Sequence, residues 1–141
     1  PRVDRDLLEK YHEGIIALSA CLAGEIPRRL VNDDYDGAKA AAERYIDIFG
    51  KENFFIEIQD HGIEDQQKIL PKLISLAREL DIPMVATNDV HYCKKEDADV
   101  QKVLIAIQTN KVVGEDNALD FQSDEFYLKS GDEGVPVGGV A

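Results

Sequence analysis

The sequence predicts an α/β fold in which parallel strands alternate with helices. Three short apolar runs, at 15–21, 54–59 and 82–86, have the length and composition of strands. Stretches with apolar residues three and four positions apart, typical of amphipathic helices, separate and follow these runs. Because such long connections bring the chain back to the same end of a sheet, the strands should be parallel, with right-handed connections and helices packed outside.

The first elements are a short helix and a buried strand. Residues 4–11 alternate charged residues with a Leu pair and should end as a helix before Gly14. The run 15–21 is apolar and bounded by turn sequences, which is typical of a strand covered on both faces. In such a strand Ser19 and Cys21 share a face, so Cys21 lies at the carboxyl end.

A helical turn and a longer helix follow. The sequence predicts the turn at 26–31 and the helix at 37–49, where Ala, Tyr, Ile and Phe recur every three or four residues. Residues 32–34 are Asn-Asp-Asp and supply capping side chains ahead of the longer helix. Gly50 ends it.

The second strand, 54–59, is rich in aromatic and β-branched residues. Its alternation places Phe55, Glu57 and Gln59 on one face. A polar pair on the inner face of a buried strand needs partners, because desolvation is costly, and this makes Glu57 a candidate site residue. An edge strand with one solvated face explains the pattern as well. His61, just past the strand, is a loop residue or a ligand.

The helix at 63–80 leads to the third strand, 82–86. Pro71 should kink that helix or mark the first turn of its main segment. A further helix is expected from Lys94 to about Thr109. Beyond it we expect a loop at 112–120, an extended piece at 121–122 and a capping sequence at 123–125 before 126–128. Residues 1–130 should form one domain, and the Gly-rich residues 131–141 a flexible or artificially added tail.

Asp89 and His91 form the central candidate site. In an extended strand they point the same way, whereas Val90 points to the other side. A carboxylate and an imidazole together suit Zn²⁺ or Mn²⁺, although two ligands alone do not hold an ion. The alternative is a turn carboxylate beside a surface histidine.

The three strand ends should meet, because parallel strands open onto one edge of a sheet. Cys21, Glu57 with Gln59, and Asp89 with His91 would then lie around one mouth. This convergence favours a metal site over the separate motifs. For Cys21, a small buried hydrophobic residue is the alternative.

Composition excludes several classes of protein. The 141 residues are 44% hydrophobic and 31% charged, which suits one globular domain. The formal net charge of −12 disfavours direct binding of a nucleic-acid backbone. No membrane span or signal peptide is recognisable, and the two cysteines are expected to be reduced, so a cytoplasmic protein is expected.

Three long motifs and one short one together resemble a known family. They are GIIALSACLAGEIP at 14–27, FIEIQDHG at 55–62, ATNDVHY at 86–92 and DEFYLK at 124–129. In this order they resemble the PHP domain of the bacterial DNA polymerase III alpha subunit, from about Arg2 to Ser130.

The resemblance implies a partial (β/α)7 barrel with a divalent metal site, Zn²⁺ or Mn²⁺, at the carboxyl ends of its strands. Carried over by motif, Cys21, Asp89 and His91 fall on metal-binding positions, and Glu57 and His61 lie near the mouth. Related PHP proteins hydrolyse phosphoesters through a trinuclear ion centre, and in replicative polymerases the domain is associated with proofreading or with supporting a separate exonuclease.

The chain also departs from the family pattern. The opening His-x-His strand and further His and Glu ligands are absent, as are the polymerase palm carboxylates, so the metal site is expected to be incomplete. The chain should correspond to the C-terminal half of the domain and to about half of its strands. Self-association, a rearranged terminus, or addition of 135–137 to a sheet edge would cover the open edges.

Two functions follow, with a third from another class. The first is a PHP segment of a replicative DNA polymerase, ancestrally a metal-dependent phosphoesterase and inactive in isolation. The second is a non-catalytic platform that docks a proofreading exonuclease or other polymerase domains, with DNA reached only through the parent polymerase. The third, a flavodoxin-like module for a phosphorylated ligand, lacks a Gly-rich phosphate loop. The sequence leaves open the metal, retained proofreading and the oligomeric state.

Overall fold

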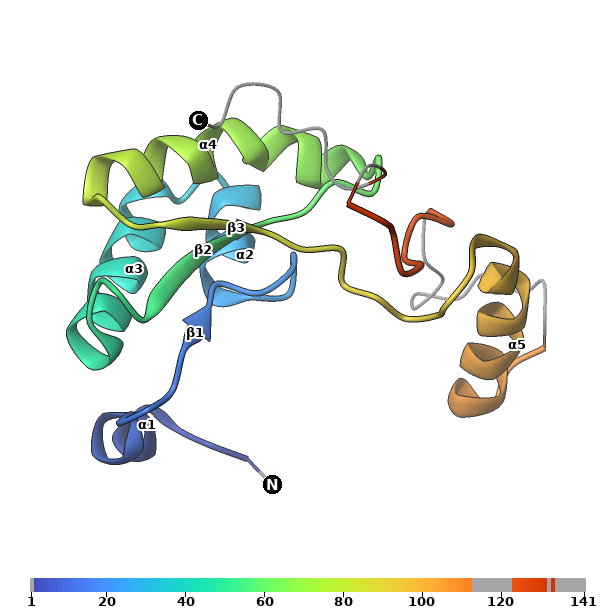
Figure 1. The fold of residues 1–141 in the computed structure, drawn as a ribbon, viewed down its shortest axis with the longest axis horizontal. Helices are drawn as coiled ribbons and strands as arrows, with labels where there is room; N and C mark the ends of the chain where they lie inside the picture. The colour runs from blue at the N-terminus through green and yellow to red at the C-terminus, as the bar shows by residue number, and fades with distance from the viewer. Residues whose placement is uncertain (1, 113–122, 132, 134–141) are drawn as a thin grey trace.

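The computed structural model describes residues 2–112, 123–131 and 133 (Figure 1). The elements follow in the order α1 (Arg5–Tyr11), β1 (Ala17–Leu18), α2 (Glu25–Val31), α3 (Tyr35–Phe49), β2 (Phe54–Ile58), α4 (Glu64–Leu80), β3 (Met84–Ala86), η1 (Lys95–Asp97) and α5 (Ala98–Thr109). No helix among the described residues is long and apolar enough to cross a membrane.

The three strands form one parallel sheet in the order β1-β2-β3. Ala17 lies opposite Phe54, and Ile56 lies opposite Met84. Helices connect the strands, as expected when the chain must return to the same end of a sheet. The predicted α/β fold with parallel strands alternating with helices is confirmed, and it is consistent with part of a PHP barrel.

The core lies on one face of β2. Phe54, Ile56 and Ile58 are buried there, while Phe55 and Glu57 on the other face are half-buried. Helices α3 and α4 pack on β2, and α2 packs on both of these helices. Around Phe54 and Ile56, the hydrophobic core cluster contains residues of these helices and their connections: Ile26, Leu30, Ala38, Ala41, Ala42, Ile48, Phe49, Ile69, Leu73, Leu76, Ala77 and Ile82.

Helix ends follow the capping chemistry of the sequence. The Asp4 and Asp34 side chains accept hydrogen bonds from the backbone N–H groups of Leu7 and Gly37, and so begin α1 and α3. Gly50 ends α3 with a φ of 82°, as its lack of a Cβ allows. The helix α4 runs through Pro71 as one element, so Pro71 does not begin a separate helix.

The first strand is shorter and more exposed than predicted. The expected strand spans 15–21, but only Ala17 and Leu18 belong to β1. Ile15, Ile16 and Leu18 are exposed, so the expectation of a strand covered on both faces is wrong. The physical reason is that β1 is an edge strand, and the chain turns away at Ala20, which has a φ of 65°.

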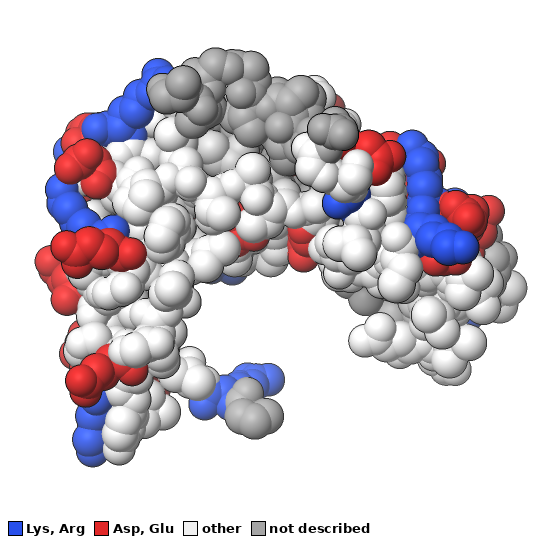
Figure 2. Space-filling model, viewed as in Figure 1, with Lys and Arg blue, Asp and Glu red and all other residues white. Residues whose placement is uncertain are grey.

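The C-terminal part of the described chain returns to the end of β3. Tyr127 pairs with Tyr92 in a parallel bridge, and Leu128 N donates to Tyr92 O at 3.2 Å. The predicted cap at 123–125 is therefore followed by an extended piece and not by a helix, because residues 126–128 pair with the chain at Tyr92. The predictions for 113–122 and for most of the tail lie outside the described residues. Figure 2 shows charged residues mainly around the outside of the hollowed face between α1 and α5.

Candidate functional site

Side chains at the carboxyl ends of the three strands are joined by hydrogen bonds. Ser19, just past β1, accepts a hydrogen bond through Oγ from Glu57 N at 2.8 Å. Gln59 Nε2, just past β2, donates to Glu57 Oε1 and to Thr87 Oγ1, both at 3.1 Å. Thr87 Oγ1 also donates to Glu57 Oε1. The polar residues predicted to need partners, Glu57 and Gln59, thus find them in each other and in the ends of both neighbouring strands.

Cys21 lies beside this network. Its half-buried side chain lines a small pocket together with Glu57, Gln59 and Gln66. Gln59 is buried, and its Oε1 has no hydrogen-bond partner within the described chain. The pocket therefore combines a thiol, a carboxylate and an unpaired amide oxygen at the ends of β1 and β2.

Asp89 and His91 lie close together, but not through the extended backbone conformation predicted for them. The strand β3 ends at Ala86, and Asp89 has a φ of 42°, so the extended alternation expected from 87 to 91 is wrong. The left-handed conformation at Asp89 turns the chain. His91 Nε2 nevertheless lies 3.5 Å from Asp89 Oδ1, and about one third of each side chain is exposed. The structure brings this pair together at the surface.

His61 holds the loop after β2 to the loop after β3. It is buried, and its Nε2 lies 2.9 Å from Asn88 O. Since a carbonyl oxygen only accepts, Nε2 carries the proton, and Nδ1 accepts from Gln66 Nε2 at 2.8 Å. The ring stacks on Phe126 with centroids 4.0 Å apart. Both ring nitrogens are therefore occupied by protein groups.

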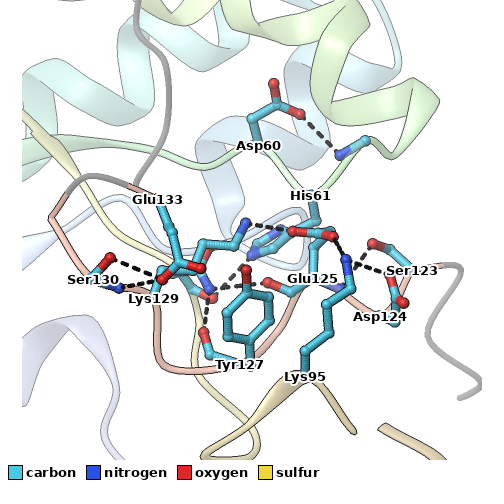
Figure 3. A network of polar contacts seen from close by, with 12 residues as sticks. Asp60, His61, Lys95, Ser123, Asp124, Glu125, Tyr127, Lys129, Ser130 and Glu133 are labelled. Carbon is cyan, nitrogen blue, oxygen red and sulfur yellow. Dashed lines mark hydrogen bonds and ion pairs between the residues drawn. The ribbon is translucent and has the colours of Figure 1, made fainter.

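Residues 123–131 are held over this region by amide and ionic contacts (Figure 3). Asn88 Nδ2 donates to the carbonyl oxygens of Glu125 and Tyr127. Glu125 pairs with Lys95 and Lys129, and the hydrogen bonds from these two lysines lower the pKa of its carboxyl. Both ammonium groups also lie over the Tyr127 ring, 5.9 and 5.5 Å from its centroid.

The donors within the described residues do not by themselves fit a complete divalent-ion centre. No three His, Cys, Asp or Glu side chains in the described ranges are arranged so that they could hold a metal ion. Cys21 therefore does not join Asp89 and His91 in such a group. Glu57 and His61 are engaged by protein partners instead. The assignment of Cys21, Asp89 and His91 as metal ligands stays a prediction.

Sequence reasoning missed three residues that organise this region: Gln66, Asn88 and Phe126. Asn88 lies inside a motif that drew attention only for Asp89 and His91. Phe126 is more than 30 positions downstream of His91, and its only signal is the aromatic pair Phe126-Tyr127, which favours an extended chain. The structure shows that Phe126 O accepts from His91 N at 2.9 Å.

Comparisons with known proteins show which family the chain is similar to. Residues 1–61 match the model of the PHP domain family. The chain is 47% identical over 133 residues to the DNA polymerase III subunit alpha of Treponema pallidum and, over an equal length, to that of Deinococcus radiodurans. The resemblance to the PHP domain of this polymerase subunit is confirmed.

The chain is also 44% identical over 133 residues to the DNA polymerase III subunit alpha of Thermus aquaticus. Each of the three matches covers 94% of the chain but only 10–11% of the relative. The chain thus spans about a tenth of the length of the curated relatives it matches.

Proposed function

We propose that this PHP segment works inside the alpha subunit of a bacterial replicative DNA polymerase, in the cytoplasm, as a structural platform for the rest of that chain. The proposal rests on one observation: the polar residues at the strand ends are hydrogen-bonded to other protein groups. Glu57 is bound by Gln59 and Thr87, and His61 is bound by Gln66 and Asn88. These contacts join loops to one another instead of leaving donors directed at a common ion.

The charge of the segment supports the same role. With a net charge of −12, it is poorly suited to hold the phosphate backbone, which clustered Lys and Arg bind. In this proposal DNA is held by other parts of the polymerase. A proofreading exonuclease is a further partner that such a platform would dock.

A second candidate function is favoured by the Asp89–His91 pair. These side chains offer a carboxylate and an imidazole 3.5 Å apart, both partly exposed. The pair would supply two donors, with Cys21 as a third after rearrangement, to a Zn²⁺ or Mn²⁺ site completed by residues outside this chain. The polymerase would then retain a phosphoesterase centre that this segment alone does not form.

Metal titration separates the two functions. Calorimetric titration of the complete polymerase with Zn²⁺ and with Mn²⁺ should give the same isotherm for the wild type, His91→Ala and Asp89→Asn if the segment is a platform. The matched control is His12→Ala, which removes the histidine that follows α1 and whose Nδ1 lies 2.9 Å from Glu9 O.

The opposite result would contradict the platform. Affinity at least about tenfold weaker in His91→Ala than in both the wild type and His12→Ala would assign a working metal site. Hydrolysis of a chromogenic phosphodiester by the wild type, lost in Asp89→Asn, would assign the phosphoesterase function.

A further inference from the structure

Helix α5 has apolar residues on two faces, and the face with more large apolar side chains is the exposed one. Ile105 and Ala106 are buried, whereas Val100, Leu104 and Ile107 are 58%, 55% and 71% exposed. Val103 is exposed as well, at 43%. In a helix with 3.6 residues per turn, positions 100, 103, 104 and 107 form one continuous stripe, roughly opposite the buried side chains. We call these four residues the α5 stripe.

No other described element covers the α5 stripe. The main packing partner of α5 is η1, the single turn before it. Figure 1 shows α5 standing apart from the sheet and from α2, α3 and α4. Four exposed aliphatic side chains in a row are unfavourable in water, and burying them against an apolar surface would stabilise the complex.

The helix that presents the stripe is held in place. At the start of η1 the Asp97 carboxylate accepts a hydrogen bond from Lys94 N at 3.0 Å, and Asn110 ends α5 in the left-handed conformation with a φ of 55°. At the N-terminal end, Lys95 forms ion pairs with Asp124 and Glu125 of the returning segment. The α5 stripe is therefore a fixed surface and not the side of a fraying terminus.

We propose that the α5 stripe docks an apolar surface of the polymerase chain that lies outside residues 1–141. This inference rests on the proposed function, because the occupant is the rest of that polymerase. The relatives are about nine times longer than the matched segment, so a covalently linked partner surface is present at high effective concentration. A second copy of this chain fits less well, because each copy carries a net charge of −12 and the copies repel.

Cysteine accessibility tests the docking. Leu104→Cys and Ile107→Cys are made in the complete polymerase and in the 141-residue chain, and alkylation by a maleimide is followed by peptide mass spectrometry. Asp99→Cys is the matched control, because its side chain is on the same helix, 88% exposed and off the stripe. We expect rapid alkylation of all three in the short chain, and alkylation of positions 104 and 107 slowed by about tenfold or more in the polymerase.

Two results would overturn the inference. Equal rates at 104 and 107 in the polymerase and the short chain would show that nothing covers the stripe. Protection at 104 and 107 in the short chain, together with a doubled mass in sedimentation, would assign a second copy as the occupant. The outcome is independent of the metal titration, so failure of docking and failure of the platform function can be told apart.

Discussion

Glu25 is the residue that ties the N-terminal helices together. Its carboxylate accepts hydrogen bonds from Arg5 and Arg44, both at 3.0 Å, and from the Tyr45 hydroxyl at 3.1 Å, and it also contacts Arg29. Partial burial opposes ionisation, but the Tyr45 hydrogen bond and the charge of Arg5 outweigh it and lower the pKa of Glu25. One side chain of α2 thereby connects α1 and α3.

We predict that Glu25→Gln weakens the fold and reduces its acid sensitivity. At pH 7 the variant should be less stable by about 2 kcal/mol, since bonds to a charged group are lost. A depressed pKa stabilises the fold above the ordinary value of 4.5, and this contribution is lost as the pH falls through the lower folded-state pKa. Urea unfolding from pH 7 down to about pH 3 should therefore show a steeper loss for the wild type than for Glu25→Gln.

The control for this prediction is Glu79→Gln. Glu79 pairs with Lys39 and Tyr35 at a more exposed position, so its replacement should have a smaller effect at pH 7. Equal stability of Glu25→Gln and the wild type across the whole pH range would show that the Glu25 network contributes nothing.

At the residue scale, the sequence predicted which strand residues need polar partners but not the geometry around Asp89 and His91. The need of Glu57 and Gln59 for partners was predictable, because β2 is a regular strand whose alternation can be counted. The orientation of Asp89 and His91 was not, because the positive φ at Asp89 is a turn property that no period encodes. The packing of Phe126 on His61 depends on a contact between segments 65 positions apart, which local pattern does not specify.

At the element scale, the helices were predicted to within about two residues and the strands less well. Helix periodicity and caps are local, so the prediction for 37–49 gave α3 and that for 63–80 gave α4. The expected helix from Lys94 begins as the separate turn η1 before α5. The length of a strand depends on its pairing partners, and β1 is paired on one side only within the described chain. The strand predicted from the apolar run 15–21 was therefore too long.

The end of α4 yields a second prediction, because Asp81 occupies an unfavourable place. It has φ 54° and ψ 48°, and the N–H of the next residue, Ile82, donates to Ala77 O at 2.8 Å in the pattern of a glycine cap. Asp81→Gly should raise the free energy of unfolding by about 1 kcal/mol, since it removes the left-handed strain and a negative charge at a helix C-terminus. Urea denaturation at neutral pH measures the change.

Asp81→Asn separates the two causes. Asn removes the charge but keeps a side chain in the left-handed region, so its gain should be smaller than that of Gly. The ion pair to Lys51, at 3.7 Å and largely exposed, should contribute little. An Asp81→Gly variant less stable than the wild type would contradict the cap argument.

At the scale of the whole molecule, the acidic charge and the open edge of the sheet act against each other. The strand β1 has its outer edge uncovered by any described strand, and Ile15, Ile16 and Leu18 are exposed beside it. Such an edge can pair with another chain. The net charge of −12 keeps copies apart while it is unscreened.

We therefore predict that the isolated chain is monomeric at low salt and associates through β1 as salt is raised. The Debye length falls from about 30 Å at 0.01 M to about 8 Å at 0.15 M, so repulsion between copies weakens while apolar contact does not. Leu18→Lys places a charge on the edge and should suppress the association, whereas Val100→Lys on α5 should leave it unchanged, because the two surfaces are separate. Sedimentation velocity across this salt range measures the masses.

The opposite pattern would contradict this prediction. If Leu18→Lys associates like the wild type while Val100→Lys stays monomeric, the contact lies on α5. Both the edge argument and the assignment of the α5 stripe to the polymerase chain would then have to be given up.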